Sequence, residues 1–178
     1  VCTIPVMFNY DAPLAHAQDI AGFLNDQISA LVANDPRHYA GLCTVPMQDT
    51  DAAIRELERA KDAGHLGVQI GSNINGLNLS EERFFPFFET CQRLGMAVMI
   101  HPWDMMGKEQ MEKYWLPWLV GMPAETARAA SSMIFGGVLE RLPNLRVMFS
   151  HAGGSFLTTL GRFEPVSYTH LRAHETKR

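Results

Sequence analysis

The chain has 178 residues, of which 47% are hydrophobic and 19% are charged, and its formal net charge is −4. These values are typical of one globular domain with a hydrophobic core, and they exclude a disordered chain. Basic residues are scattered, which argues against a nucleic-acid-binding surface. No apolar run approaches the roughly 20 residues that cross a bilayer, so no membrane association is expected.

The cysteines and the first residues indicate the setting of the chain. Cys2, Cys43 and Cys91 lie in apolar segments and lack the spacing of a metal site. This odd, sparse set predicts reduced thiols in the core of a cytoplasmic protein. The sequence begins without Met, and residues 1–5 resemble the middle of a strand. We therefore expect the natural amino terminus to lie further upstream.

Helix and strand patterns alternate along the chain. Helical spacing covers residues 11–33, and a strand pattern covers 39–45. Asp49 and Asp51 favour the start of a second helix, which Gly64 ends. The alternation continues with strands at 66–70, 96–100 and 145–149, helices at 80–94, 123–141 and 154–163, and a polar loop at 71–78.

This alternation predicts βαβ units around a parallel sheet, and therefore an α/β fold. An open sheet and a closed barrel both fit the pattern. The chain supplies about five strands, whereas a closed barrel needs eight strands and typically about 250 residues. No GxGxxG or GxxxxGK[ST] motif follows a strand, which disfavours nucleotide binding. We favour a partial (β/α)8 TIM barrel with about five of its eight units.

Two of the strand patterns lead into a histidine. The strand at 96–100 ends on His101, and the strand at 145–149 continues through Ser150 to His151. Catalytic groups of β/α barrels come from the carboxyl ends of strands, and neutral imidazole is a good ligand for divalent metals. We therefore expect the two histidines to share one site. The alternative for each is a structural role, bonded to a neighbouring carbonyl or placed in an ordinary βα turn.

The residues after His151 have two interpretations. Gly153 and Gly154 permit close approach of backbone to a ligand and the start of a helix that faces an anion. They are equally ordinary in a βα turn. Arg162 lies near the end of the following helix and, taken alone, is interpreted as a surface arginine.

An insertion at 102–121 separates the strand predicted at 96–100 from the next helix. Its aromatic segment at 114–123 contains two of the three tryptophans. Such a segment fits a pocket roof or a subunit interface, and composition favours a core position as strongly. Met105 and Met106 are interpreted as gap-filling core residues.

The end of the chain differs from the rest. We expect residues 1–163 to form the partial barrel and 164–178 to be a non-native tail that resembles translated sequencing adaptor. His170 and His174 would share a helix face, a spacing that can bind metal. We nevertheless interpret them as foreign residues.

Five strings of the sequence resemble a known family, the metal-dependent amidohydrolase-like decarboxylases. The strings lie at residues 4–8, 67–71, 101–105, 113–126 and 151–154. The long aromatic string at 113–126 is highly specific, whereas the short histidine motifs would be weak alone. The resemblance covers residues 1 to about 163 and excludes the tail.

The resemblance implies a (β/α)8 barrel that holds one Zn²⁺ at the carboxyl ends of its strands. His101 matches a metal ligand, and His151 matches a histidine that acts on the metal-bound water and the substrate. Trp118 matches a tryptophan of the substrate pocket, and Arg162 matches an arginine that holds a substrate carboxylate in a neighbouring subunit. The implied activity is non-oxidative decarboxylation of 2-amino-3-carboxymuconate 6-semialdehyde by a homodimer, without an organic cofactor.

The sequence also departs from the family. The His-x-His pair after the first strand and the aspartate after the eighth strand are absent. A catalytic zinc site takes at least three protein ligands, so we expect this polypeptide as written to bind zinc poorly and to be inactive. The alternatives are a decarboxylase of aromatic hydroxy-carboxylates, a hydrolase of the same superfamily and a catalytically inactive β/α scaffold.

Overall fold

The computed structural model describes residues 1–166. Most of the predicted tail, including His170 and His174, lies outside the described residues, so its assignment stays a prediction. Within residues 1–166, no helix combines the length and the apolar character that crossing a membrane requires.

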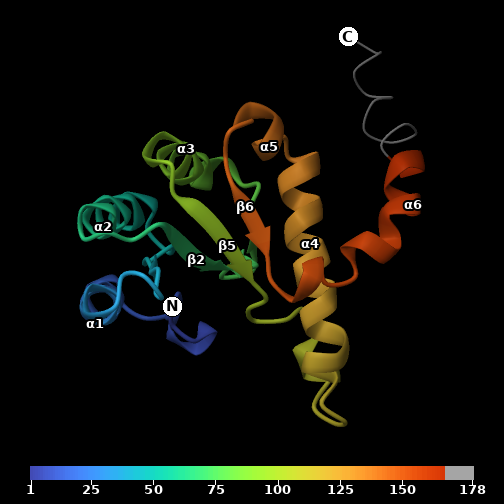
Figure 1. The fold of residues 1–178 in the computed structure, drawn as a ribbon. Helices are drawn as coiled ribbons and strands as arrows, with labels where there is room; N and C mark the ends of the chain where they lie inside the picture. Colours follow the sequence, from blue (N-terminus) through green and yellow to red (C-terminus); the bar gives the residue numbers. More distant parts are fainter. Residues whose placement is uncertain (167–178) are drawn as a thin grey trace.

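Four parallel strands form the central sheet (Figure 1). They are β1 (Leu42–Cys43), β2 (Gly67–Gly71), β5 (Ala97–His101) and β6 (Val147–Phe149), and they neighbour one another in that order. A doubly wound sheet reverses its strand order at a switch point, whereas here each strand is added beside the previous one. The sequential order argues against a doubly wound sheet and is the order of strands in a β/α barrel.

The sheet has fewer strands than the five predicted, because residues 1–5 are not a strand. They lead into a 3₁₀ turn, η1 (Pro5–Met7), although the Val1 carbonyl accepts a hydrogen bond from Leu42 N–H (2.8 Å) beside β1. Strand β1 is also shorter than predicted. The Asn25 side chain bonds both the N–H and the carbonyl of Thr44 (2.9 Å each). These bonds take the place of the hydrogen bonds that Thr44 would make to a neighbouring strand.

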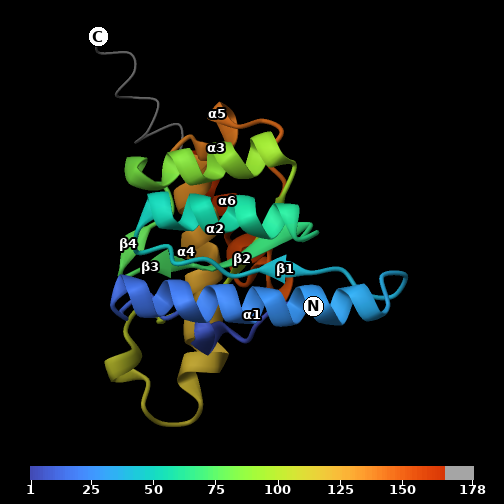
Figure 2. The same cartoon turned by 90° about the vertical axis from the view of Figure 1, so that its left-hand side faces the viewer.

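The helices are α1 (Leu14–Asn34), α2 (Thr50–Asp62), α3 (Phe85–Leu94), α4 (Met122–Phe135), α5 (Val138–Arg141) and α6 (Phe156–Val166). Helices α1, α2 and α3 lie side by side over one face of the sheet (Figure 2). Asp49 caps α2, since its carboxylate accepts the N–H of Ala52 (2.8 Å), as the sequence indicates.

Three predicted elements differ from the structure for local reasons. The helix predicted to start at Ser80 begins at Phe85 after a 3₁₀ turn, η2 (Glu82–Phe84), because Pro86 has no N–H and is tolerated only in a first turn. The helix predicted over 123–141 is divided into α4 and α5 at Gly137, whose φ is +73°.

The loop predicted at 71–78 contains a hairpin of β3 (Asn73–Ile74) and β4 (Leu77–Asn78). Its turn is Asn75-Gly76, with φ of +50° and +80°, the dipeptide typical of a type I′ turn.

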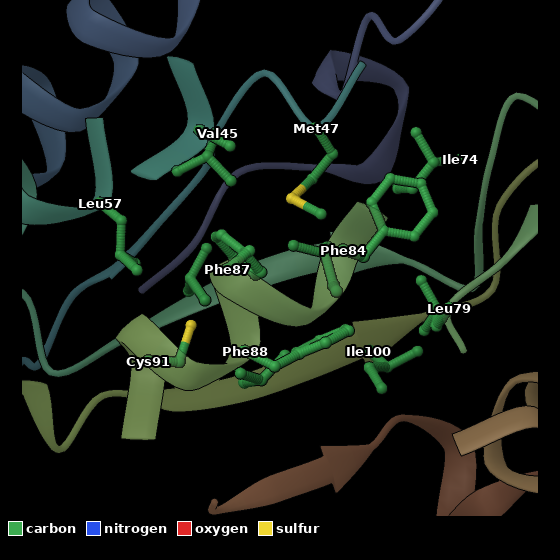
Figure 3. Packing of buried hydrophobic residues seen from close by; sticks show 14 of the residues in the cluster. Val45, Met47, Leu57, Ile74, Leu79, Phe84, Phe87, Phe88, Cys91 and Ile100 are labelled. Atoms are coloured by element: carbon green, nitrogen blue, oxygen red, sulfur yellow. The ribbon is translucent and has the colours of Figure 1, made fainter. Parts of the chain in front are cut away.

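The core lies between the sheet and its helices (Figure 3). Val68, Val98 and Ile100 project from alternate positions of β2 and β5 and are fully buried. Phe87 and Phe88 of α3 pack edge to face at 5.6 Å between ring centroids.

The buried thiols of Cys43 and Cys91 agree with the sequence prediction, whereas Cys2 is exposed. The prediction that Met106 fills a core gap is wrong, because its side chain is 45% exposed. The aromatic segment does not lie in the core either, since Tyr114 and Trp115 are 80% and 71% exposed. A short 3₁₀ turn, η3 (Lys108–Gln110), and a π-helical turn, η4 (Pro117–Gly121), complete the insertion.

Candidate active site

The two predicted histidines meet at the carboxyl edge of the sheet. His101 is the last residue of β5, and His151 follows β6 in a 3₁₀ turn, η5 (His151–Gly153). Ser150 fixes the end of β6, because its N–H and its hydroxyl both donate to the Ile100 carbonyl (3.0 Å each). The Nε2 atoms of His101 and His151 are 3.1 Å apart, with the rings nearly perpendicular at 76°. The strand-end positions therefore place two imidazoles in one site.

The hydrogen bond at Nδ1 of His101 leaves the lone pair of the ring on Nε2, the atom that faces His151. His101 Nδ1 lies 2.9 Å from the Pro102 carbonyl, which can only accept, so Nδ1 carries the proton and Nε2 carries the lone pair. Burial lowers the pKa of His101 below its usual range, the nearby His151 lowers it further, and the bond to Pro102 opposes both. The neutral imidazole is thus favoured, and it is the form that binds a metal.

The turn at His151 has an uncommon backbone. His151 and Ala152 both adopt positive φ (+54° and +55°), a region that costs non-glycine residues of order 1–3 kcal/mol and often marks functional sites. Gly154 packs closely on α4, since a Cβ there would lie 2.5 Å from the Pro123 carbonyl. Ser155 donates its N–H and its hydroxyl to that same carbonyl (3.1 and 3.2 Å). These residues pack α6 on α4, and the interpretation of the turn as an anion site stays a prediction.

A cavity of about 470 Å³, here called the His101 pocket, opens beside His101. Its walls are mainly apolar and come from the amino-terminal turn, from residues 101–108 and from residues 117–122. The lining residues are Pro5, Val6, His101, Pro102, Trp103, Asp104, Met105, Lys108, Pro117, Trp118 and Met122. Trp118 thus lines the pocket, as the resemblance implies, and Trp115 packs on it edge to face at 4.9 Å. Lys108 and Asp104 form an exposed ion pair at the pocket wall.

Arg162 is the predicted site residue that the structure does not bring to the histidines. It lies exposed on α6, it does not line the His101 pocket, and it has no hydrogen bond within the described residues. Its predicted role in a neighbouring subunit stays a prediction.

The histidine pair fits part of a metal site. Two nitrogens bound at about 2 Å to one tetrahedral ion lie about 3.3 Å apart, close to the 3.1 Å between the two Nε2 atoms. Over residues 1–166, no group of three or more His, Cys, Asp or Glu side chains gathers around a common point. The described residues therefore offer two nitrogen ligands, and a catalytic site would need further ligands from elsewhere.

Sequence reasoning missed a buried polar group behind the pocket. Glu125 on α4 is 0% exposed and contacts Ser72 and Asn73, which follow β2. The rule that singled out His101 and His151 applies equally to these residues after β2. The interpretation of residues 71–78 as a loop concealed them.

A parallel β/α arc with imidazoles at the carboxyl ends of its strands is the arrangement of a β/α-barrel enzyme. The chain belongs to the amidohydrolase family Amidohydro_2, which matches residues 6–172.

Relatives support both the fold and the family. The 2-amino-3-carboxymuconate-6-semialdehyde decarboxylase of Dictyostelium discoideum is 56% identical over 163 residues, 91% of this chain and 45% of that protein. Its namesake in Caenorhabditis elegans is 31% identical over 210 residues, 90% of this chain and 52% of that protein. The chain thus spans about half the length of the curated relatives it matches.

A solved structure confirms the barrel class. The crystal structure of 5-carboxyvanillate decarboxylase from Novosphingobium aromaticivorans holds manganese and 4-hydroxy-3-methoxy-5-nitrobenzoic acid. It matches with a TM-score of 0.87 at 27% identity, over 97% of this chain and 50% of that one. The chain is therefore a partial amidohydrolase-like β/α barrel.

Proposed function

We propose that this chain is part of a metal-dependent, non-oxidative decarboxylase that acts on 2-amino-3-carboxymuconate 6-semialdehyde. The observation that carries the proposal is the 3.1 Å approach of the His101 and His151 Nε2 atoms beside the His101 pocket. The substrate assignment is supported by the 56% identity to the Dictyostelium decarboxylase.

The metal proposed is Zn²⁺, and His101 would hold it through Nε2. When bound, such an ion lowers the pKa of a coordinated water and polarises substrate oxygens. Manganese in the Novosphingobium relative supports a divalent ion in general and makes Mn²⁺ the rival to zinc. Protein ligands beyond His101 would come from sequence outside this chain.

His151 would move the proton. Its ring is exposed at the mouth of the site, so Nε2 can exchange a proton with water. In decarboxylation the bond between the substrate carbon and the carboxylate breaks, and its electron pair stays on the conjugated substrate. His151 Nε2–H then donates its proton to that carbon as carbon dioxide leaves.

The remaining predicted groups would bind substrate. Trp118 would cover the apolar face of the conjugated chain, since it lines the His101 pocket. Arg162 would hold a substrate carboxylate in the partner subunit of a cytoplasmic homodimer, and its exposure on α6 leaves it accessible for that role.

The main rival is a decarboxylase of aromatic hydroxy-carboxylates. The observation that favours it is the 5-carboxyvanillate decarboxylase structure, which matches 97% of this chain with a TM-score of 0.87. Its lower identity, 27% against 56%, places it second.

The test uses the gene that encodes this chain together with its flanking coding sequence. We expect loss of the semialdehyde chromophore and release of carbon dioxide without oxygen consumption, and one divalent ion per subunit by metal analysis. Turnover of 5-carboxyvanillate in place of the semialdehyde would establish the rival. H151A should lower kcat by about 100-fold or more.

Two variants complete this design. H38A is the matched control, because His38 is an exposed histidine paired with Asp35 in the turn after α1 and does not line the His101 pocket, and its kcat should stay at the wild-type value. R162A should raise KM or abolish turnover, and unchanged kinetics would remove Arg162 from the proposal.

A further inference from the structure

We propose that Glu125 is a positioning residue, which holds the wall of the His101 pocket in its ligand-binding shape through hydrogen bonds to the segment after His101. The inference deepens the proposed function, on which its ligand-binding part rests. Glu125 would touch neither substrate nor metal.

The carboxyl group of Glu125 is 0% exposed and has donors on both oxygens. Oε1 accepts the N–H of Met106 (3.0 Å) and Nη1 of Arg128 (3.1 Å). Oε2 lies 3.1 Å from the Ser72 hydroxyl and 3.2 Å from Asn73 Nδ2. Burying a carboxylate is costly unless it is paired and bonded in this way, so the arrangement requires all of these partners together.

The same donors hold the pocket wall directly. The Ser72 hydroxyl accepts the N–H of Trp103 (2.9 Å), and Asn73 Nδ2 donates to the Trp103 carbonyl (2.7 Å). Residues 103–106 are therefore bonded to the end of β2 on one side and to α4 on the other. Trp103, Asp104 and Met105 of this segment line the His101 pocket.

The segment needs such support because its backbone is strained. Asp104 adopts a φ of +42°, and conformations of this kind persist only where the surrounding structure imposes them. Gly121, one helical turn before Glu125, allows close packing, since a Cβ there would lie 3.0 Å from Met105. Packing at Gly121 of η4 and bonding at Glu125 of α4, the helix that follows directly, thus both fix the segment.

Arg128 extends the network to the hairpin. Its Nε donates to Asn78 Oδ1 (2.9 Å) and its Nη2 to the Gly76 carbonyl (2.8 Å). Glu125 consequently connects α4, the hairpin after β2 and the segment after β5. Asn73 of the hairpin takes part in the same network, because its Nδ2 contacts both the Trp103 carbonyl (2.7 Å) and Glu125 Oε2 (3.2 Å).

The experiment compares E125A and E125Q with S72A and a control, N25A. Asn25 is also buried and makes three hydrogen bonds, but it joins α1 to β1 and α2, away from the pocket. Two properties of the full chain are measured: hydrogen exchange of the Trp103 and Met106 amides, and quenching of tryptophan fluorescence by 4-hydroxy-3-methoxy-5-nitrobenzoic acid with Zn²⁺ present.

We expect E125A to raise exchange at both amides by about 10- to 100-fold, the range for losing bonds to a charged group, while amides of β2 and β5 stay protected. E125Q should give a smaller rise, because an amide oxygen can still accept from Met106. S72A should raise hydrogen exchange most at the Trp103 amide. If E125A does not fold, S72A still tests the proposal.

The affinity for the nitrobenzoic acid probe should fall in E125A and S72A. It should stay unchanged in N25A, even if N25A lowers the unfolding midpoint as much as E125A and S72A do. Unchanged exchange at both amides in E125A, or an equal loss of probe binding in N25A, would overturn the inference. Absence of quenching in the unsubstituted chain would count against the proposed substrate pocket instead, and the exchange data would then decide the role of Glu125 alone.

Discussion

The chain up to β5 and the chain after it differ in the burial of their apolar side chains and in backbone strain. All five residues of β2 are buried, and Phe87, Phe88, Val98 and Ile100 form a fully covered core. After His101, large apolar side chains lie exposed along the insertion and α6. Of the seven described non-glycine residues with positive φ, five lie after His101 and two before it. The first region provides stability, and the second holds strained positions at the site.

The largest effect should come from the core of the first region. Phe88→Ala removes a fully buried ring and should lower the free energy of unfolding by about 3–5 kcal/mol, measured by urea denaturation. Leu119→Ala, at a side chain 67% exposed, should change it by about 0.5 kcal/mol or less. If both variants lowered the free energy of unfolding by a similar amount, the insertion would be packed in solution. The difference in stability between the two regions would then not hold.

A second effect concerns zinc binding at the histidines that end β5 and follow β6. We expect the chain as written to bind Zn²⁺ weakly, because the described residues supply two imidazoles. His101→Ala should weaken this binding by about 10-fold or more, as measured by calorimetry, whereas His38→Ala should leave it unchanged. One tightly bound zinc per chain, with turnover, would contradict the expected inactivity of this polypeptide.

A smaller effect concerns the pH dependence of stability in the first region. Burial lowers the pKa of His65, against weaker opposing effects of Asn25, Glu56 and Asp26. The unfolded chain therefore binds the proton more readily, so stability rises with pH between the lowered folded value and the ordinary pKa of about 6.5. His65→Gln should flatten this slope in unfolding curves recorded from about pH 5 to 8.

The pKa of His101 is also lowered, so His101 likewise makes stability rise with pH. Because His101 is present in both the wild type and the His65→Gln variant, the difference between their slopes reports on His65. An unchanged slope in the variant would show that His65 is not the titrating group.

The smallest effect should come from the exposed pair at the pocket wall. Lys108→Met removes the partner of Asp104, and both side chains are well exposed, 62% and 44%. Exposed ion pairs contribute about 0–1 kcal/mol, so thermal unfolding should shift little, and less still in 1 M salt. A large loss would mean that the insertion depends on this pair for its shape.

Local chemistry made much of the fold predictable. Apolar runs that end on His101 and lead to His151 located both strand ends, and Asp49 located the start of α2. Pro86 carried a local signal that overruled the Ser80 start, and Asn75-Gly76 carried the hairpin signal. The order of the strands was not local, and it came only from the assembled sheet.

The site was predictable where it depended on strand ends and unpredictable where it depended on distant contacts. Glu125 meets Ser72 from 53 positions away in the sequence, and no spacing rule connects them. Trp118 was placed by resemblance, because its aromatic context alone fitted three locations. Met106 shows the limit of composition, since an apolar residue beside a site can face solvent.

The sequential strand order has a consequence for biogenesis. Each newly synthesised β/α unit finds its docking surface already present in the unit that left the ribosome before it, so assembly can proceed vectorially with short chain closures. A polypeptide interrupted at a unit boundary keeps every contact made up to that point.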